Sequence, residues 1–148
     1  QGNALHGNTI GRNTAVGDSA MAWAGFGQSN VAVGTEALAT VDNGNFNIAI
    51  GDSSLAGALN TNGNVAIGYK TLSKQQAQGW NTAVGYYSQR DSSKSTYYNT
   101  SIGAYSMEFN RTGVYNTGLG LSTLRLTDSA SYNTAVGADA MYFHRKNG

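Results

Sequence analysis

The sequence predicts an all-β protein, a parallel β-solenoid or β-roll of about eight coils with 17 residues each. First, a five-residue motif recurs at a fixed spacing along nearly the whole chain. Second, 20 glycines suit many tight corners, and the absence of proline leaves a ladder of backbone hydrogen bonds uninterrupted. Third, only 11% of residues are charged and the polar remainder is rich in Asn, Thr, Ser and Gly, which disfavours helices. We find no break in composition, so residues 1–148 are predicted to form one repeat domain.

The repeated motif consists of Asn, a small or β-branched residue, Ala, Val or Ile, and Gly. Its eight copies read NTAVG, NVAVG, NIAIG, NVAIG, NTAVG, NTSIG, NTGLG and NTAVG, and they are 17 residues apart except for one step of 18. Self-similarity at a fixed period is the signature of a repeat architecture. A period of 17 is too short for the common helical repeats and fits two short strands and two turns.

The leading asparagines are predicted to form a structural ladder, in which each side-chain amide bonds to the coils above and below it. The members of this ladder are Asn13, Asn30, Asn47, Asn64, Asn81, Asn99, Asn116 and Asn133.

Two neighbouring columns of the motif carry further expectations. The residue before each glycine, from Val16 to Val136, is always branched and apolar, which predicts an inward-facing core position. The preceding column, from Ala15 to Ala135, never holds a residue larger than Ala, which predicts that a partner packs closely against it. The glycines themselves predict corners with positive φ.

A second apolar column lies four residues after each glycine, where a returning strand is expected. It reads Met21, Leu38, Leu55, Leu72, Gln89, Met107, Leu124 and Met141. The exception, Gln89, precedes the single 18-residue step, so we expect a local bulge between Gln89 and Tyr98.

The pentads NVAIG and NTAVG, followed by DSAM, TEAL or DSSL, resemble the head repeats of trimeric autotransporter adhesins and the related NTAVG repeats of bacteriophage tail-fibre proteins. The resemblance covers Asn8 to Met141. It implies a left-handed parallel β-roll, three identical chains packed side by side, and attachment at a cell surface or a virion tail fibre. The adhesin heads repeat in fewer residues and are followed by a stalk, so only scaffold positions carry over.

An aromatic column precedes the repeat asparagines in the second half of the chain. It comprises Trp80, Tyr98, Tyr115 and Tyr132, which are predicted to stack as a ladder that binds sugar rings. The cations Arg90, Lys94, Arg111 and Arg125 are candidates for pairing with acidic groups of the same glycan or receptor. The alternative interpretation is that stacked aromatic rings only stabilise the solenoid or an interface between chains.

Other classes of function find little support. The eight acids are scattered and the two histidines, His6 and His144, lie at opposite ends of the chain, so no catalytic constellation, metal site or cofactor site is predicted. A net charge of +1 gives no reason to expect nucleic acid as a partner. No run of apolar residues is long enough to insert this segment into a membrane.

Three functional hypotheses remain. The first is a non-catalytic adhesive or spacer segment of an extracellular fibre. The second is a filament subunit that stacks end to end, because the part before Ala66 has one cation and four acids (net −3) and the part after Val65 has eight cations and four acids (net +4). The third, an ice-binding solenoid, needs a regular Thr array, which only the second half approaches in Thr82, Thr100, Thr117 and Thr134.

Overall fold

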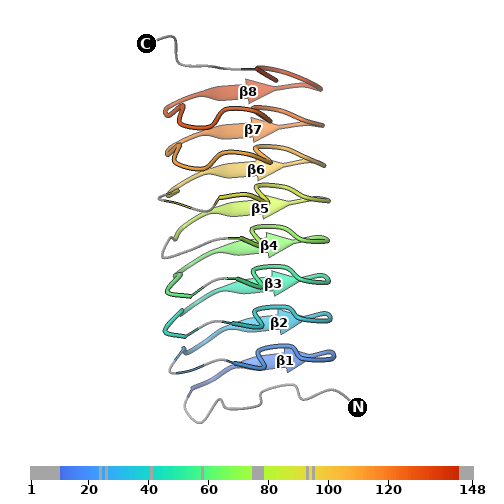
Figure 1. Ribbon diagram of the computed structural model, residues 1–148, viewed down its shortest axis with the longest axis vertical. Helices are drawn as coiled ribbons and strands as arrows, with labels where there is room; N and C mark the ends of the chain where they lie inside the picture. The colour runs from blue at the N-terminus through green and yellow to red at the C-terminus, as the bar shows by residue number, and fades with distance from the viewer. Residues whose placement is uncertain are drawn as a thin grey trace.

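The computed structural model describes residues 11–143 apart from residues 24, 26, 41, 58, 75–78, 93 and 95. Eight strands form one parallel sheet in chain order, so that each coil adds one strand beside the last (Figure 1). The predicted all-β parallel solenoid is therefore confirmed. The strands are β1 (Thr14–Val16), β2 (Val31–Val33), β3 (Ile48–Ile50), β4 (Val65–Ile67), β5 (Thr82–Val84), β6 (Thr100–Ile102), β7 (Thr117–Leu119) and β8 (Thr134–Val136).

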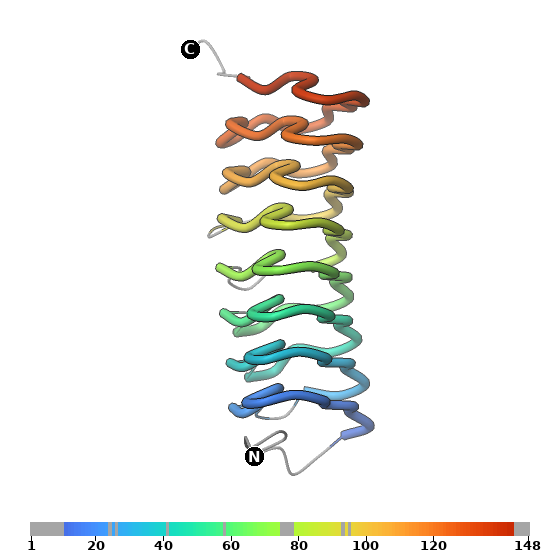
Figure 2. The backbone as a smooth tube through the Cα atoms, turned by 90° about the vertical axis from the view of Figure 1, so that its right-hand side faces the viewer, coloured from blue at the N-terminus to red at the C-terminus, as the bar shows by residue number. Residues whose placement is uncertain are grey.

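Equivalent residues of the repeat pair with one another at every step of the sheet. Ala32 pairs with Ala49, and Ala49 pairs with Ala66. The smooth tube in Figure 2 shows the resulting stack of coils, with the two ends of the described chain at opposite ends of the rod. With about 4.8 Å between neighbouring strands, the stack from β1 to β8 is roughly 35 Å long.

The 18-residue step leaves this register intact, since Ala83 pairs with Ser101. Asn81 Nδ2 donates to the carbonyl of Thr96, 15 residues ahead, whereas the amide of Asn47 reaches 14 residues ahead. The extra residue of this coil therefore lies before Thr96. The segment where we expected a bulge includes residues 93 and 95, which are outside the described part of the chain. Pairing is already regular again at Tyr97, which bridges to Gly79.

The segment that returns after each glycine corner is a pair of overlapping turns, so the expectation of a second strand there is wrong. Glu36 and Leu38 have φ values of 54° and 51°, which are left-handed and not extended. Each turn still bonds to both neighbouring coils: the N–H of Leu38 donates to Ser54 of the next coil at 3.0 Å, and that of Glu36 to Asp18 of the preceding one at 2.9 Å.

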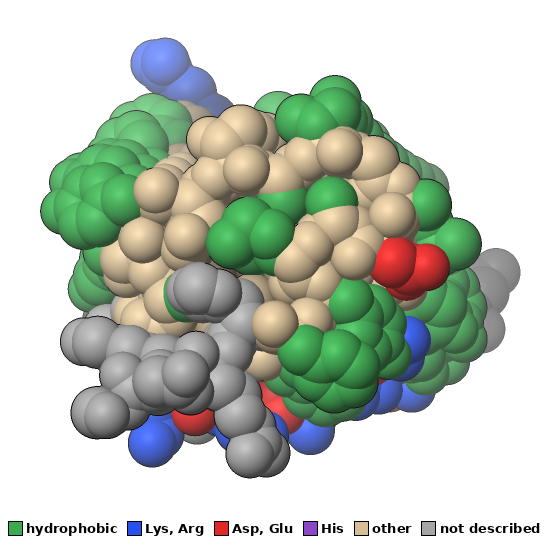
Figure 3. Space-filling model, turned by 90° about the horizontal axis from the view of Figure 1, so that it is seen from above, with side chains coloured by type: hydrophobic (Ala, Val, Ile, Leu, Met, Phe, Trp, Pro, Cys, Tyr) green, Lys and Arg blue, Asp and Glu red, His purple; other side chains and the backbone are tan. Residues whose placement is uncertain are grey.

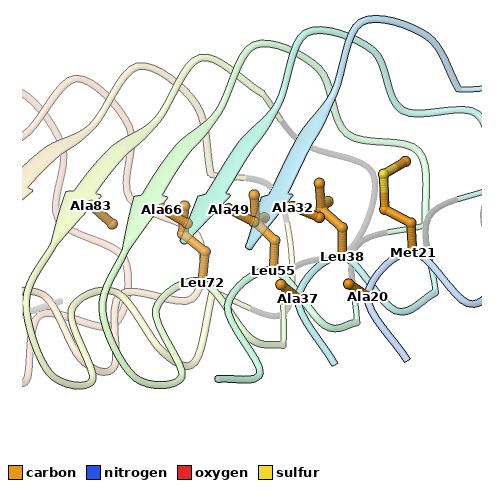
Figure 4. Close-up of a cluster of buried hydrophobic side chains, with 10 residues drawn as sticks. All are labelled: Ala20, Met21, Ala32, Ala37, Leu38, Ala49, Leu55, Ala66, Leu72 and Ala83. Carbon is orange, nitrogen blue, oxygen red and sulfur yellow. The ribbon is translucent and has the colours of Figure 1, made fainter. Parts of the chain in front are cut away.

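The core is formed by the alanine column of the strands and the Leu/Met column of the returning turns (Figure 4). Ala32, Ala49 and Ala66 are fully buried, as are Leu38 and Leu55. The column Ala15 to Ala135 therefore packs against its own coil, which corrects the expectation of a neighbouring chain at this position. Only a small residue (Ala, Ser or Gly) fits here because the opposite side of the thin coil already supplies a large side chain.

The branched column before the glycines was expected in the core, and this was wrong. In a three-residue strand only the middle side chain points inward, because successive side chains alternate between faces. Val16 and Val136, at the two ends of the column, are 58% and 66% exposed. The glycine corners are confirmed: Gly51 has a φ of 124°, and a Cβ there would lie 2.6 Å from the carbonyl oxygen of Gly68.

A polar layer interrupts the core between β5 and β6. Gln89 is fully buried, and its side chain lies 3.5 Å from Asn81 Oδ1 and from Ser101 Oγ. Ser101, which replaces alanine in the strand column, is bonded to the hydroxyl of Ser88 at 2.8 Å. This layer separates the core cluster that ends at Ala83 from a second one around Met107 and Leu124.

Candidate binding surfaces

The asparagine ladder runs along the start of the strands and is confirmed. Asn47 Oδ1 accepts from the backbone N–H of Asn64 at 3.0 Å and from the side-chain amide of Asn64 at 3.0 Å. Asn47 Nδ2 donates to the carbonyl of Thr61 in the next coil at 2.8 Å. Each such amide ties a strand to the following coil through both backbone and side chain, and Asn47 and Asn64 are fully buried. From Asn30 to Asn116 the ladder is buried scaffold, and only its end members Asn13 and Asn133 are partly exposed.

The aromatic column lies just outside this ladder, and three of its four members stack. The ring centroids of Tyr98 and Tyr115 are 5.0 Å apart at an interplanar angle of 12°, and those of Tyr115 and Tyr132 are 5.1 Å apart at 10°. Tyr98 and Tyr115 are each 49% exposed and Tyr132 is 77% exposed. We call these three residues the tyrosine ladder.

Trp80 belongs to the same column and is exposed, but its ring lies against Gly63 of the preceding coil. A Cβ at Gly63 would be 2.5 Å from a ring carbon of Trp80. Space explains why glycine occurs here, because the ring of Trp80 fills the place of a side chain. The backbone conformation alone does not require glycine, since φ is positive at Gly63 (66°) but also at Trp80 (61°) and Tyr115 (56°). Non-glycine residues pay roughly 1–2 kcal/mol for this conformation.

Arg90 and Arg125, two of the predicted binding cations, lie in a different column, five residues after a glycine corner. Between them in the stack is Glu108, which is only 3% exposed and pairs with Arg90 at 3.1 Å and with Arg125 at 2.8 Å. Burial lowers the pKa of Arg125, but the hydrogen bond and the charge of Glu108 outweigh it, so that the pKa is raised. Both guanidinium groups are thus already paired with a carboxylate of the same chain.

Tyrosines surround these arginines at the end of the strands opposite the tyrosine ladder. The guanidinium of Arg90 lies 4.7 Å from the ring centroid of Tyr87, and that of Arg125 lies 4.5 Å from the ring of Tyr105. Tyr69 and Tyr86 stack at 5.3 Å and extend the group. We call Tyr69, Tyr86, Tyr87 and Tyr105 the corner cluster. The sequence reasoning missed it, although reading the columns one, two and five residues after each glycine shows both the tyrosines and the Arg, Glu, Arg order.

Lys94 and Arg111, the other predicted cations, follow each other in the loops before the strands, where the N–H of Lys94 donates to the carbonyl of Arg111 at 3.2 Å. The Arg111 side chain lies 3.3 Å from Asp128 and 3.8 Å from Asp91. Lys94 is exposed. The four cations are therefore divided between two regions of the rod and do not form one site.

The outer face of the sheet is a strip of apolar side chains. It is formed by the branched column at the end of the strands. In β2, β3 and β4 the first strand residue is apolar as well, so that Ile48 and Ile50 flank the buried Ala49, whereas the other strands begin with Thr. Seen from the β8 end, hydrophobic side chains gather at separate places around the rim, and polar and backbone atoms occupy much of the end between them (Figure 3). The exposed members of this strip are Val16, Ile48, Ile50, Ile67, Ile102, Leu119 and Val136.

Across the described residues, no group of three or more His, Cys, Asp or Glu side chains is placed to hold a metal ion. The same part of the chain contains no helix of the length and hydropathy that a membrane span requires. His6 and His144 lie outside the described residues.

Comparison with known proteins adds no assignment, since no protein-family model, curated protein or solved structure matches the chain. The class of protein that the fold defines is a parallel β-solenoid with a single short strand in each coil.

Proposed function

We propose that this chain is a non-catalytic, adhesive segment of an extracellular fibre, on a cell surface or a virion tail, that binds a glycan or another receptor through the side of the rod. The observation that carries the proposal is the tyrosine ladder, a row of exposed rings at nearly constant spacing that lies outside the buried core. Exposed aromatic side chains that the fold does not need for its core are typical of recognition surfaces.

Self-association is the second part of the proposal, and the outer sheet face supports it. A continuous apolar strip along seven strand pairings is unusual on a chain that stays alone in water. The resemblance to adhesin heads makes a left-handed roll and a homotrimer the arrangement that we propose. The interface in that trimer would be the strip around Ile50 and Ile67, because the alanine column faces the core.

Retention on immobilised cell-surface glycans tests the adhesive role. We expect binding by the unchanged protein and a loss of roughly tenfold or more for Tyr115→Ala, which removes the central ring of the ladder. Tyr86→Ala is the matched control, because it removes an exposed ring that contacts three other tyrosines of the corner cluster. Equal retention of all three proteins, each with an unchanged melting curve, would assign the tyrosine ladder to the scaffold alone.

The alternative is an extracellular filament subunit whose coils stack end to end. Within the described residues, β1 pairs only with β2 and β8 only with β7, so end-to-end stacking would add strands at the outer edges of β1 and β8. The excess of acids in the first coils and of cations in the last adds attraction between unlike ends. Long fibres in negative-stain micrographs of a dilute sample would favour this function, and discrete short rods would exclude it.

A further inference from the structure

The stacking geometry of the tyrosine ladder limits how a ligand can approach it. Tyr115 has a neighbouring ring at 5.0 Å on one face and at 5.1 Å on the other, and both are nearly parallel to it. A sugar therefore cannot lie flat on Tyr115, which is how isolated aromatic residues bind carbohydrate. What the ladder offers to solvent along its length is a row of ring edges and hydroxyl groups.

This row has one ring for each coil, and its direction follows the stacking of the coils. Its period is set by the hydrogen-bonded strands, at about 4.8 Å. A ligand that contacts several rings must therefore run parallel to the rod axis and repeat at nearly the same distance. An extended peptide does not keep this period, because its residues advance by about 3.3 Å and its equivalent side chains by twice that.

An extended β-1,4-linked chain of hexoses has the required period, since its rise per sugar is close to the spacing between stacked strands. It also carries hydroxyl groups on every unit, which suit a row of tyrosine hydroxyls that both donate and accept hydrogen bonds. We propose that the tyrosine ladder binds one unbranched β-1,4-linked polysaccharide chain parallel to the rod axis, with successive sugars against Tyr98, Tyr115 and Tyr132. This inference rests on the adhesive function proposed above and specifies its ligand.

Positive φ belongs to this column from the second coil onward, since Ser29 (55°) and Phe46 (59°) share it with Tyr98 (58°), Tyr115 (56°) and Tyr132 (61°). The conformation costs a non-glycine residue about 1–2 kcal/mol. Stacking of the rings offsets part of this cost, at about 0.5–1.5 kcal/mol for each pair.

The test is a titration of the intact chain with cello-oligosaccharides of two to six glucose units, followed by calorimetry. Malto-oligosaccharides of the same lengths are the ligand control, because they contain the same sugar in a linkage that does not extend with this period. We expect affinity to rise with length in the cello series until the sugars span the ladder, and to stay flat in the malto series.

Tyr115→Phe is the decisive variant, because it keeps the stacked ring and removes only the hydroxyl. We expect it to weaken cello-oligosaccharide binding by roughly twofold to tenfold, the range for one hydrogen bond, and to leave the melting curve unchanged. Tyr86→Phe, in the corner cluster, should bind as the unchanged protein does.

Three results would overturn the inference: no dependence on length, equal binding of both series, or full binding by Tyr115→Phe. Retention on other immobilised glycans together with any of these would leave the adhesive function standing and remove only this ligand. If no glycan of any kind is retained, the adhesive function itself fails.

Discussion

Each ladder asparagine does more than bond to the asparagine above it. Asn64 Oδ1 accepts from the backbone N–H of Asn81 at 3.0 Å and from its side chain at 3.3 Å, in a place that water does not reach. The side-chain oxygen thus accepts the hydrogen bond from a backbone N–H of the next coil, as a backbone carbonyl does elsewhere in the sheet. A buried N–H that loses its acceptor costs far more than an exposed one, because water cannot replace the bond.

We therefore expect Asn64→Ala to lower the free energy of unfolding by about 2–3 kcal/mol, since it leaves the N–H of Asn81 buried without its acceptor. Urea denaturation followed by circular dichroism measures this. Asn60→Ala, at an exposed position a few residues earlier, is the control and should change stability by less than about 0.5 kcal/mol. Equal effects of the two variants would mean that the buried amide contributes nothing specific.

At the scale of one coil, the repeated pattern was readable from the sequence and the orientation of its side chains was not. The fold, the strand register and the asparagine ladder follow from column identity alone, because every member of a column obeys the same constraint. Hydrophobicity alone predicts Val and Ile at the strand ends to lie in the core, but a three-residue strand admits one inward side chain, and the thin coil limits that side chain to Ala, Ser or Gly. The space inside a coil depends on the left-handed turns around Leu38, for which the sequence offers no glycine signal.

The site was predicted less completely for a related reason. The tyrosine ladder was found because its members share a column, whereas Arg90 and Arg125 were grouped with it on charge and position in the second half of the chain. Their shared partner, Glu108, comes into view only when the column five residues after each glycine is read as a stack. Trp80 departs from the ladder because Gly63 leaves room for its ring.

The coil that contains Gln89 allows a test of how far the core tolerates a polar layer. We expect Gln89→Leu to leave the free energy of unfolding unchanged or to raise it by up to about 1.5 kcal/mol, because the new side chain joins the two apolar clusters. Ser101 keeps its bond to Ser88, so no hydroxyl is left without a partner.

The reciprocal change, Leu55→Gln, should lower stability by at least about 2 kcal/mol, since Leu55 lies in the apolar cluster between Leu38 and Leu72 of the neighbouring coils and offers the amide no equivalent partner. Thermal or urea unfolding of the two variants side by side provides the comparison. A clear loss of stability in Gln89→Leu would show that the 3.5 Å hydrogen bonds of Gln89 to Asn81 and Ser101 stabilise the fold.

At the scale of the whole rod, the main unexplained surface is the apolar outer face of the sheet. Its side chains contribute nothing to the core of their own coil, yet they are β-branched or aliphatic in every repeat. Burying such a strip against other copies of the chain would remove several large apolar side chains from water in each molecule, at about 25 cal/mol for every Å². Assembly of this kind is the physical basis of the proposed trimer.

We expect Ile67→Lys to prevent lateral assembly while changing the stability of the single rod by less than about 1 kcal/mol, because Ile67 is already 36% exposed in one chain. Light scattering on a sizing column, over a range of concentrations, measures the mass. Leu59→Lys is the control, since Leu59 is 46% exposed but lies outside the sheet. An unchanged mass for Ile67→Lys would place the interface, if there is one, on another face.

The direction of the hydrogen bonds has a mechanical consequence. Nearly every bond between coils, in the strands and in the asparagine ladder, runs along the length of the rod, so tension between its ends loads these bonds one junction after another. We expect such a rod to lengthen in discrete steps of one coil as the terminal coils peel away, each step releasing about 17 residues of slack. Under a sudden force, a fibre built from such rods would lengthen by unfolding terminal coils, and the force on its attachment to a surface would stay lower.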